Sequence, residues 1–356
     1  MLFRVYDGLD AVEPPAVSPR LRGPLRLALA AGLGLTLAGR LGGLAWWLEL
    51  WSHFPLQLGL GLGCCALLAA GLRSPRLALL ALLGAAANLV QLAPLYLPPA
   101  AVAAAPAELA AGGTAGRSPE VEAPGAPRLD LVAFNTLTRN PRKAEVGAYL
   151  AAQAPDLVAL VEVDTRWLEA LRQALPGYTI VEAAPQPDNF GMLLALRSDR
   201  AGLEVEASRV IRAITPAERS FPSIEARLRL EGRPLDLLIL HTMPPKGAGE
   251  AALRDRQLAA AASWAAARSA PALVLGDLNI TRFSPRFAEL LRVGGLQDSA
   301  LGRGYQASWP YPALPVLGIP IDQALYGRGI RVLDRRVGPG LGSDHRPTEL
   351  AIALDG

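Results

Sequence analysis

The chain has 356 residues, of which 51% are hydrophobic, and a formal net charge of +3 at pH 7. This length and hydrophobicity allow more than one structural module. Residues 129–356 contain 26 Lys and Arg against 25 Asp and Glu, and residues 1–128 contain 9 against 7. This balance excludes a strongly basic nucleic-acid-binding surface over the whole chain, although a local basic groove stays open. Cys64 and Cys65 both lie in an apolar segment, so the C-terminal part needs no disulfide.

Three apolar segments precede residue 98. Residues 54–72 and 77–97 carry no charge, and each is close to the ~20 residues with which a helix crosses a bilayer. A further segment, about 25–47, is a weaker candidate because it contains Arg26 and Arg40. This first segment also resembles a signal peptide, but no cleavage site followed by soluble sequence comes after it. We therefore expect three membrane-spanning helices, with a signal or re-entrant first segment as the alternative.

Basic residues flank these segments unevenly. They lie before the first segment and between the second and third, and they are Arg20, Arg22, Arg26, Arg73 and Arg76. The loop at 47–53 has no Lys or Arg, and its Trp47, Trp51 and His53 are typical of a membrane interface. The positive-inside rule then predicts that the N-terminal segment 1–24 is cytoplasmic and that everything after residue 97 lies outside the cytoplasm.

A change of composition separates the apolar region from a second module. Residues 98–127 are rich in Pro, Ala and Gly and predict a flexible linker before a domain at 128–356. Strands are predicted at 129–135, 156–163, 191–198, 204–208, 224–230, 234–242, 272–279 and 322–327. Helices are predicted at 143–153, 166–175, 254–269 and 283–294. This alternation predicts an α/β or α+β fold, and the continuously apolar strands indicate sheets that are covered on both faces.

Polar side chains follow several of the apolar strand runs. They are Asn135, Glu162, His241, Asp277 and Asn279. Polar groups at strand ends can converge on one edge of a sheet, which is where active sites of layered α/β folds lie. Each residue alone is explained equally well as a capping or surface group. Five such endings, together with Asp344 and His345 in GSDHRPTEL, indicate a shared site.

The order of these fragments resembles the endonuclease/exonuclease/phosphatase superfamily, which includes deoxyribonuclease-like and sphingomyelinase-like phosphodiesterases. The resemblance covers about residues 129–351 and rests on the ordered set N, PDLVALVE, LILHT, GDLN, ID and SDH. It implies a four-layer sandwich of two packed β-sheets flanked by helices, here preceded by a transmembrane helical region. The HTMPP segment at 241–245, with the preceding apolar segments, looks like a bacterial membrane-anchored branch, which implies the bacterial inner membrane.

The resemblance also implies roles for individual residues. It implies a metal site at Glu162, with Asn135 and Asp344 beside it, and hard carboxylate oxygens suit Mg²⁺, with Mn²⁺ as the alternative ion. His345 matches the catalytic histidine that contacts the scissile phosphate, and Asp322 matches its carboxylate partner.

Three more residues would complete the implied reaction. Asp277 matches the residue that orients or deprotonates the attacking water, while Asn279 and His241 match groups that contact the phosphate. The implied mechanism is an in-line attack of water on phosphorus. Asn189 is a weaker candidate, because an Asn that forms a turn before Gly191 explains it equally well.

Several functions stay open at this stage. A nuclease needs a basic, aromatic-lined groove, whereas a lipid or small-molecule phosphoesterase gains from a membrane anchor. A non-catalytic membrane-tethered binding module is disfavoured because Glu162, Asp277 and His345 are all present. A transporter is disfavoured because the apolar segments contain no acidic pathway residue. Nucleotide-dependent transfer is disfavoured because the chain has no GxGxxG or P-loop lysine motif.

Overall fold

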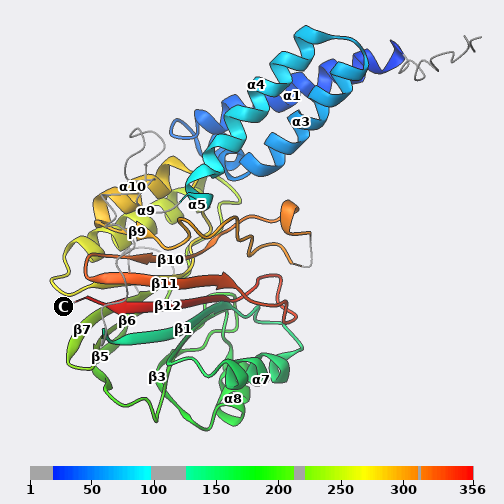
Figure 1. Cartoon of the computed structure of the whole chain (residues 1–356). Coiled ribbons are helices and arrows are strands. Elements are labelled where there is room, and N and C mark those ends of the chain that lie inside the picture. Colours follow the sequence, from blue (N-terminus) through cyan, green and yellow to red (C-terminus); the bar gives the residue numbers. More distant parts are fainter. Residues whose placement is uncertain (1–18, 98–125, 212–220, 312–313, 356) are drawn as a thin grey trace, which may run out of the picture.

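The computed structural model describes residues 19–97, 126–211, 221–311 and 314–355. Its C-terminal domain contains two 6-stranded sheets (Figure 1). The first sheet has the strand order β11-β12-β1-β2-β4-β3, with β1 and β2 parallel and the other neighbours antiparallel. Its strands are β1 (Arg128–Asn135), β2 (Leu157–Val161), β3 (Tyr178–Ala184), β4 (Met192–Arg197), β11 (Ile330–Val337) and β12 (Thr348–Leu354).

The second sheet repeats this plan. Its order is β5-β6-β7-β8-β10-β9, and β7 and β8 form its parallel pair. Its strands are β5 (Leu203–Ile211), β6 (Ser223–Leu230), β7 (Arg233–Ile239), β8 (Ala272–Asp277), β9 (Gln297–Asp298) and β10 (Asp322–Tyr326). Each parallel pair is connected through a helix, as a parallel connection requires.

The strand sequences explain the layers. In β1, Leu129 and Leu131 face the second sheet, whereas Val132 and Phe134 face helices, because successive side chains point to opposite faces. Helices α7 (Lys143–Gln153) and α8 (Thr165–Ala174) cover the first sheet, and α9 (Ala248–Ala266) and α10 (Pro285–Gly294) cover the second. The predicted four-layer sandwich of two packed sheets flanked by helices is confirmed.

Most of the predicted elements are present, with informative exceptions. The helix predicted at 143–153 has these bounds, and α10 begins at Pro285 after the Ser284 cap. Strands β3, β9, β11 and β12 are not among the predicted elements. In β11 the charged residues Arg331, Asp334 and Arg335 interrupt the apolar pattern, and a β-bulge shifts its register.

A bundle of helices precedes this domain (Figure 1). Its elements are η1 (Pro19–Leu21), α1 (Arg22–Arg40), α2 (Trp46–Glu49), η2 (Leu50–His53), α3 (Pro55–Gly71), α4 (Pro75–Leu89), η3 (Val90–Leu92) and α5 (Ala93–Tyr96). Glycines allow the three long helices to approach closely. A Cβ at Gly32 of α1 would lie 2.8 Å from the side chain of Leu62, and one at Gly84 of α4 would lie 3.0 Å from it.

The described part of the helical bundle contains one helix, Pro75–Tyr96, that is long and apolar enough to cross a membrane. Trp46–His53 and Pro55–Gly71, bent by 70°, form a second candidate if they act as one span. Helix α1 ends at Arg40, so this arginine lies at a helix end and not within a span. The predicted linker at 98–127 lies almost entirely outside the described residues.

One end of the helical bundle packs against the C-terminal domain (Figure 1). Gly302 and Gly304 donate backbone hydrogen bonds to the carbonyls of Pro94 and Leu95, over 3.1 and 2.6 Å. His53, which we expected at a membrane interface, is only 5% exposed, and its Nδ1 lies 2.9 Å from Thr281 Oγ1. That prediction is wrong because the domain covers the loop, which no local pattern of the loop reveals.

Candidate active site

The two sheets bring their polar strand ends to one place. Asn135 ends β1, and Glu162 directly follows the neighbouring parallel strand β2. In the second sheet, Asp277 at the end of β8 pairs in register with Asp322 at the start of the antiparallel strand β10. Asn135, Glu162, Asp277 and Asp322 therefore reach a common site from opposite sheets, because each lies at or directly after the end of a buried strand.

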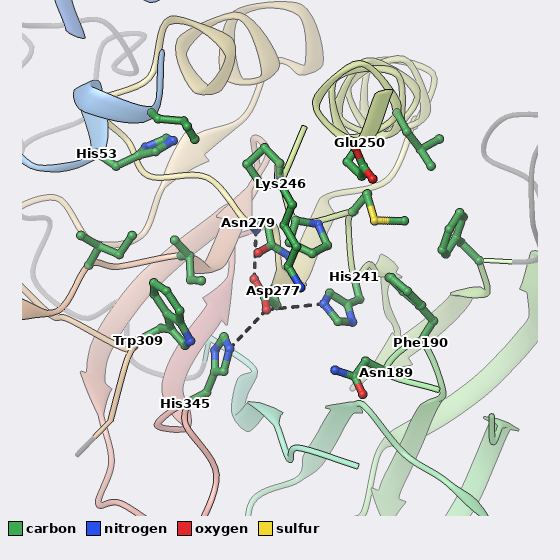
Figure 2. Close-up of a pocket in the computed structure, with 18 of the residues that line it drawn as sticks. His53, Asn189, Phe190, His241, Lys246, Glu250, Asp277, Asn279, Trp309 and His345 are labelled. Carbon is green, nitrogen blue, oxygen red and sulfur yellow. Dashed lines mark hydrogen bonds and ion pairs between the residues drawn. The ribbon is translucent and has the colours of Figure 1, made fainter. Parts of the chain in front are cut away.

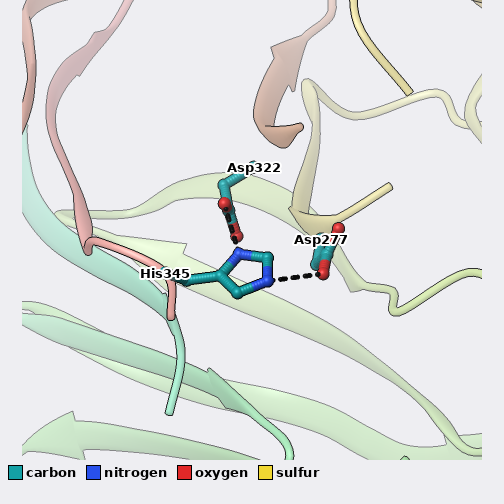
Figure 3. A group of neighbouring side chains, drawn as sticks. All are labelled: Asp277, Asp322 and His345. Carbon is teal, nitrogen blue, oxygen red and sulfur yellow. Dashed lines mark hydrogen bonds and ion pairs between the residues drawn. The ribbon is translucent and has the colours of Figure 1, made fainter. Parts of the chain in front are cut away.

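His345 lies between two carboxylates (Figure 3). Its Nδ1 is 2.8 Å from Asp322 Oδ2, and its Nε2 is 3.5 Å from Asp277 Oδ2. Burial lowers the pKa of His345, but Asp322 and Asp277 outweigh this effect and raise the pKa to about 10. The ring is therefore a cation at neutral pH, held in one orientation by Asp322.

Asn135 connects the two sheets at the base of the site. Its Nδ2 donates to Glu162 Oε1 over 2.9 Å and to Asp277 Oδ2 over 3.1 Å. Its Oδ1 accepts a hydrogen bond from the backbone N–H of Leu137 over 3.1 Å. The amide is thereby fixed, and it positions two carboxylates that come from different sheets.

Two further predicted residues adjoin Asp277 (Figure 2). His241 Nε2 lies 3.5 Å from Asp277 Oδ2, and burial lowers the pKa of this histidine. The backbone N–H of Asn279 donates to Asp277 Oδ1 over 3.0 Å, and its side-chain Nδ2 donates to the carbonyl of Thr242 over 2.8 Å. An amide nitrogen carries two hydrogens, so Asn279 retains one donor after this bond.

The backbone at the site has sparsely populated conformations. Glu162 and Asn279 have φ angles of 62° and 47°, in the left-handed region that non-glycine residues seldom adopt. Such strain persists where the surrounding structure enforces it, and it concentrates at functional sites. Gly276 has a φ of 136°, and a Cβ there would lie 1.9 Å from the carbonyl oxygen of Leu240. The glycine of the GDLN motif is therefore required to place Asp277.

Asp344, the third predicted metal residue, lies differently from the other two. It lines the cleft, but its Oδ2 accepts a hydrogen bond from Trp309 Nε1 over 3.2 Å. The backbone carbonyl of Asp344 accepts a further bond from Tyr311 N over 2.8 Å. Asp344 thus fixes the Trp309 loop beside His345, whose ring centre lies 6.5 Å from that of Trp309.

The site concentrates buried carboxylates. Glu162, Asp277 and Asp322 are each at most 5% exposed. Burial is the largest cause that raises the pKa of Glu162 and of Asp277. Asp277, Asp322 and His345 offer ligand atoms within 4.8 Å of one another, which makes them a candidate metal group. However, both His345 nitrogens already face carboxylates, and a protonated imidazole cannot ligate a metal.

Glu162 offers a better metal position. Its two oxygens accept hydrogen bonds from Asn135 Nδ2 and from the backbone N–H of Thr138, at 2.9 and 3.3 Å, and both donors are neutral. A buried carboxylate whose hydrogen-bond donors are neutral is costly to keep ionised, and a bound cation would compensate its charge. Hard oxygen donors of this kind fit a divalent cation such as Mg²⁺.

Several cleft residues were not predicted from the sequence (Figure 2). Lys246 points into the cleft, five residues after His241 in the HTMPPK segment, and Trp309 stands beside His345. Phe190 stacks near His241, with ring centres 5.1 Å apart. Asn189, the weaker candidate from the sequence, also lines this cleft. The proximity of Lys246 to His241 in the chain was an available signal, whereas Trp309 has no neighbouring motif.

Comparison with known proteins agrees with this geometry. Residues 132–345 match the model of the Endonuclease/Exonuclease/phosphatase family, and the chain belongs to this family. No curated protein matches the sequence.

Solved structures share the fold. A Danio rerio TDP2 complexed with single-strand DNA product is 19% identical, covers 64% of this chain and 99% of its own, and has a TM-score of 0.53. An endonuclease/exonuclease/phosphatase from Bacteroides vulgatus is 19% identical, covers 64% of this chain and 99% of its own, and has a TM-score of 0.53. The human Nocturnin catalytic domain with bound sulfate anion is 18% identical, covers 65% of this chain and 96% of its own, and has a TM-score of 0.52.

Proposed function

We propose that this protein is a membrane-anchored, divalent-metal-dependent phosphodiesterase. The observation that carries the proposal is the convergence of Asn135, Glu162, Asp277, Asp322 and His345 from both sheets into one cleft. Membership of a phosphoesterase family supports the same chemistry. Catalysis by such a site consists mainly of positioning water and stabilising the charge that develops on the phosphoryl group.

We assign the metal site to Glu162 and Asn135, with Asp344 as a further acidic group near it. A Mg²⁺ or Mn²⁺ ion bound there supplies positive charge against the phosphate oxygens. Glu162 is anchored by Thr138 and Asn135, so its carboxylate is held in position before any ion binds. Anchoring of this kind preorganises a site and lowers the cost of reaching the reactive geometry.

The other residues act on the phosphate and on water. His345, kept protonated by Asp322, donates from Nε2 to a phosphoryl oxygen. Its Nε2 and that of His241 lie 3.5 Å from Asp277, longer than a good hydrogen bond, so both remain available to the phosphate. Asp277 orients the attacking water and takes its proton, and Asn279 uses its remaining N–H on a phosphate oxygen.

Chelation and a change of Glu162 test the metal assignment. In full-length protein in detergent, EDTA should abolish the hydrolysis of bis(p-nitrophenyl) phosphate, and added Mg²⁺ should restore it. Glu162→Gln should lower the Mg²⁺-supported rate by more than about 100-fold, because loss of even an outer-shell partner costs about 10–100-fold. Glu169→Gln on the exposed face of α8 is the matched control. An EDTA-resistant rate, or an unimpaired Glu162→Gln enzyme, would show that the metal assignment is wrong.

The proposed orientation places the catalytic domain outside the cytoplasm. The domain packs against the end of the bundle that is formed by η2 and α5. The opposite end contains the basic residues, and there Arg22 donates a hydrogen bond to the carbonyl of Leu72. Exposed leucines along the bundle, such as Leu27, Leu67 and Leu83, are 75, 77 and 59% exposed and support burial in lipid.

Reporter fusions test this orientation. We take α1 as a third crossing beside the two candidate spans of the bundle, so alkaline phosphatase fused after residue 110 should be active in a bacterial host. A β-galactosidase fusion at the same residue should be inactive. The reverse pair of activities would overturn the proposed orientation.

A further inference from the structure

The helical bundle forms part of the catalytic cleft. The cleft has a volume of about 1490 Å³, and its floor contains His241, Asp277 and His345. One of its walls is made by Leu50, Trp51, His53 and Phe54, the residues that connect α2 to α3. Figure 2 shows His53 of this wall on the opposite side of the cleft from Phe190. The bundle therefore lies where a substrate would enter, and it is more than an anchor.

Residues directly before and after this wall in the chain bond to the domain. Before it Glu49, 2% exposed, accepts hydrogen bonds from Arg254 Nη2, over 2.5 Å, and from Ser284 Oγ. After it Gln57 Nε2 donates to the carbonyls of Val316 and Gly318, over 2.9 and 3.0 Å. These polar bonds hold the wall in place relative to the site residues.

The cleft above the catalytic floor is mainly apolar. The apolar lining comes from both modules: Leu50, Trp51, Phe54, Phe190, Phe221, Met243, Pro244, Pro245, Leu253, Ile319 and Ile321. Among the described residues that line the cleft, the Lys and Arg side chains are those of Lys246 and Arg256. A nucleic-acid strand requires a continuous cationic track for successive phosphates. One phosphate attached to a hydrocarbon requires only a small polar floor under apolar walls.

The bundle that supplies the apolar wall also exposes apolar side chains of the kind found in membrane segments. Trp51 and Phe54 line the cleft, with ring centres 6.4 Å apart. Along the same bundle Leu44 and Trp47 are 78 and 56% exposed. An acyl chain that passes from a bilayer along this surface to the cleft does not have to cross water. Each Å² of apolar surface that is kept out of water avoids a cost of about 25 cal/mol.

We propose that the natural substrate is a phosphodiester of a membrane lipid, with its hydrocarbon against Trp51, Phe54 and Phe190 and its phosphate over His345 and Asp277. This inference rests on the proposed phosphodiesterase function. In the reaction, the oxygen of water bonds to phosphorus and one P–O ester bond breaks. The proton from water reaches the leaving alkoxide by way of Asp277, which yields an alcohol and a phosphomonoester.

A chain-length series tests the inference. The substrates are p-nitrophenyl methyl, butyl and octyl phosphates at concentrations below micelle formation, with the full-length protein in nanodiscs and Mg²⁺. Each fully buried methylene is worth about fourfold in binding, so kcat/KM should rise by at least about 100-fold from methyl to octyl. Trp51→Ala combined with Phe54→Ala should reduce this octyl-to-methyl ratio at least tenfold. Val293→Ala, at an exposed apolar residue of α10 that does not line the cleft, should leave the ratio unchanged.

The outcomes separate the two proposals. If neither the methyl ester nor bis(p-nitrophenyl) phosphate is hydrolysed, the phosphodiesterase function itself fails. If both are hydrolysed but the ratio stays near one, the lipid inference fails and the function stands. Single-stranded DNA is the last substrate in the comparison. If its kcat/KM exceeds that of the octyl ester, the protein is a nuclease and the lipid inference fails.

Discussion

Replacement of His345 by alanine should reduce phosphodiester hydrolysis by at least about 10³-fold, the scale expected for a charged donor that stabilises the charge developing on the phosphoryl group. The His345 imidazolium lies between the carboxylates of Asp322 and Asp277, and its positive charge stabilises both. Its removal leaves two buried carboxylates without their shared cation and leaves the phosphate without its donor. Initial rates with bis(p-nitrophenyl) phosphate at saturating Mg²⁺ measure the loss.

A substitution of Asp322, the partner of His345, distinguishes a loss of catalysis from a loss of folding. Asp322→Asn keeps the shape of the side chain but weakens the hold on the His345 Nδ1 proton, so we expect a loss of about 10² in kcat with KM little changed. Asp334→Asn, an exposed position on β11, is the matched control. Circular dichroism of each variant should match the parent. Full activity in a folded His345→Ala protein would remove His345 from the catalytic site.

The sequence predicts which residues meet at the candidate site where those residues lie at strand ends. Asn135, Glu162 and Asp277 each follow a continuous apolar run, and the sheet topology alone then brings them together. The pairing of Asp322 with His345 came from the family resemblance, and the structure gives it a distance of 2.8 Å. Local patterns thus specify which residues face the site wherever regular secondary structure carries them.

Contacts made by irregular segments and between modules could not be predicted in this way. Trp309 reaches Asp344 from a loop without periodicity, so no pattern connects the two residues. Glu49 appeared as one acid in an aromatic loop, and its partner Arg254 is 205 positions away in the chain. A buried ion pair of this kind depends on how two modules dock, and a single sequence contains no local signal for docking.

Loss of the Glu49 carboxylate should loosen the packing of Trp46–His53 against the C-terminal domain. Arg254 is 0% exposed, and breaking a buried ion pair by removal of one partner costs about 3–5 kcal/mol. In Glu49→Ala, backbone amides of Trp46–His53 should therefore exchange with deuterium at least about 100-fold faster, whereas β1 and β2 should exchange as in the parent. Glu169→Ala, with an exposed carboxylate on α8, should change neither rate.

A second substitution distinguishes docking from an unspecific loss of packing. Glu49→Leu with Arg254→Met replaces both charges by apolar groups, and such exchanges of a buried pair are often neutral or stabilising. The double variant should therefore recover most of the protection that either single variant loses, which is the coupling expected of residues in direct contact. Because the same contact positions Trp51 and Phe54 over the cleft, octyl-ester hydrolysis should fall in Glu49→Ala and return in the double variant. Additive losses in the double variant would show that the ion pair does not hold the wall in place.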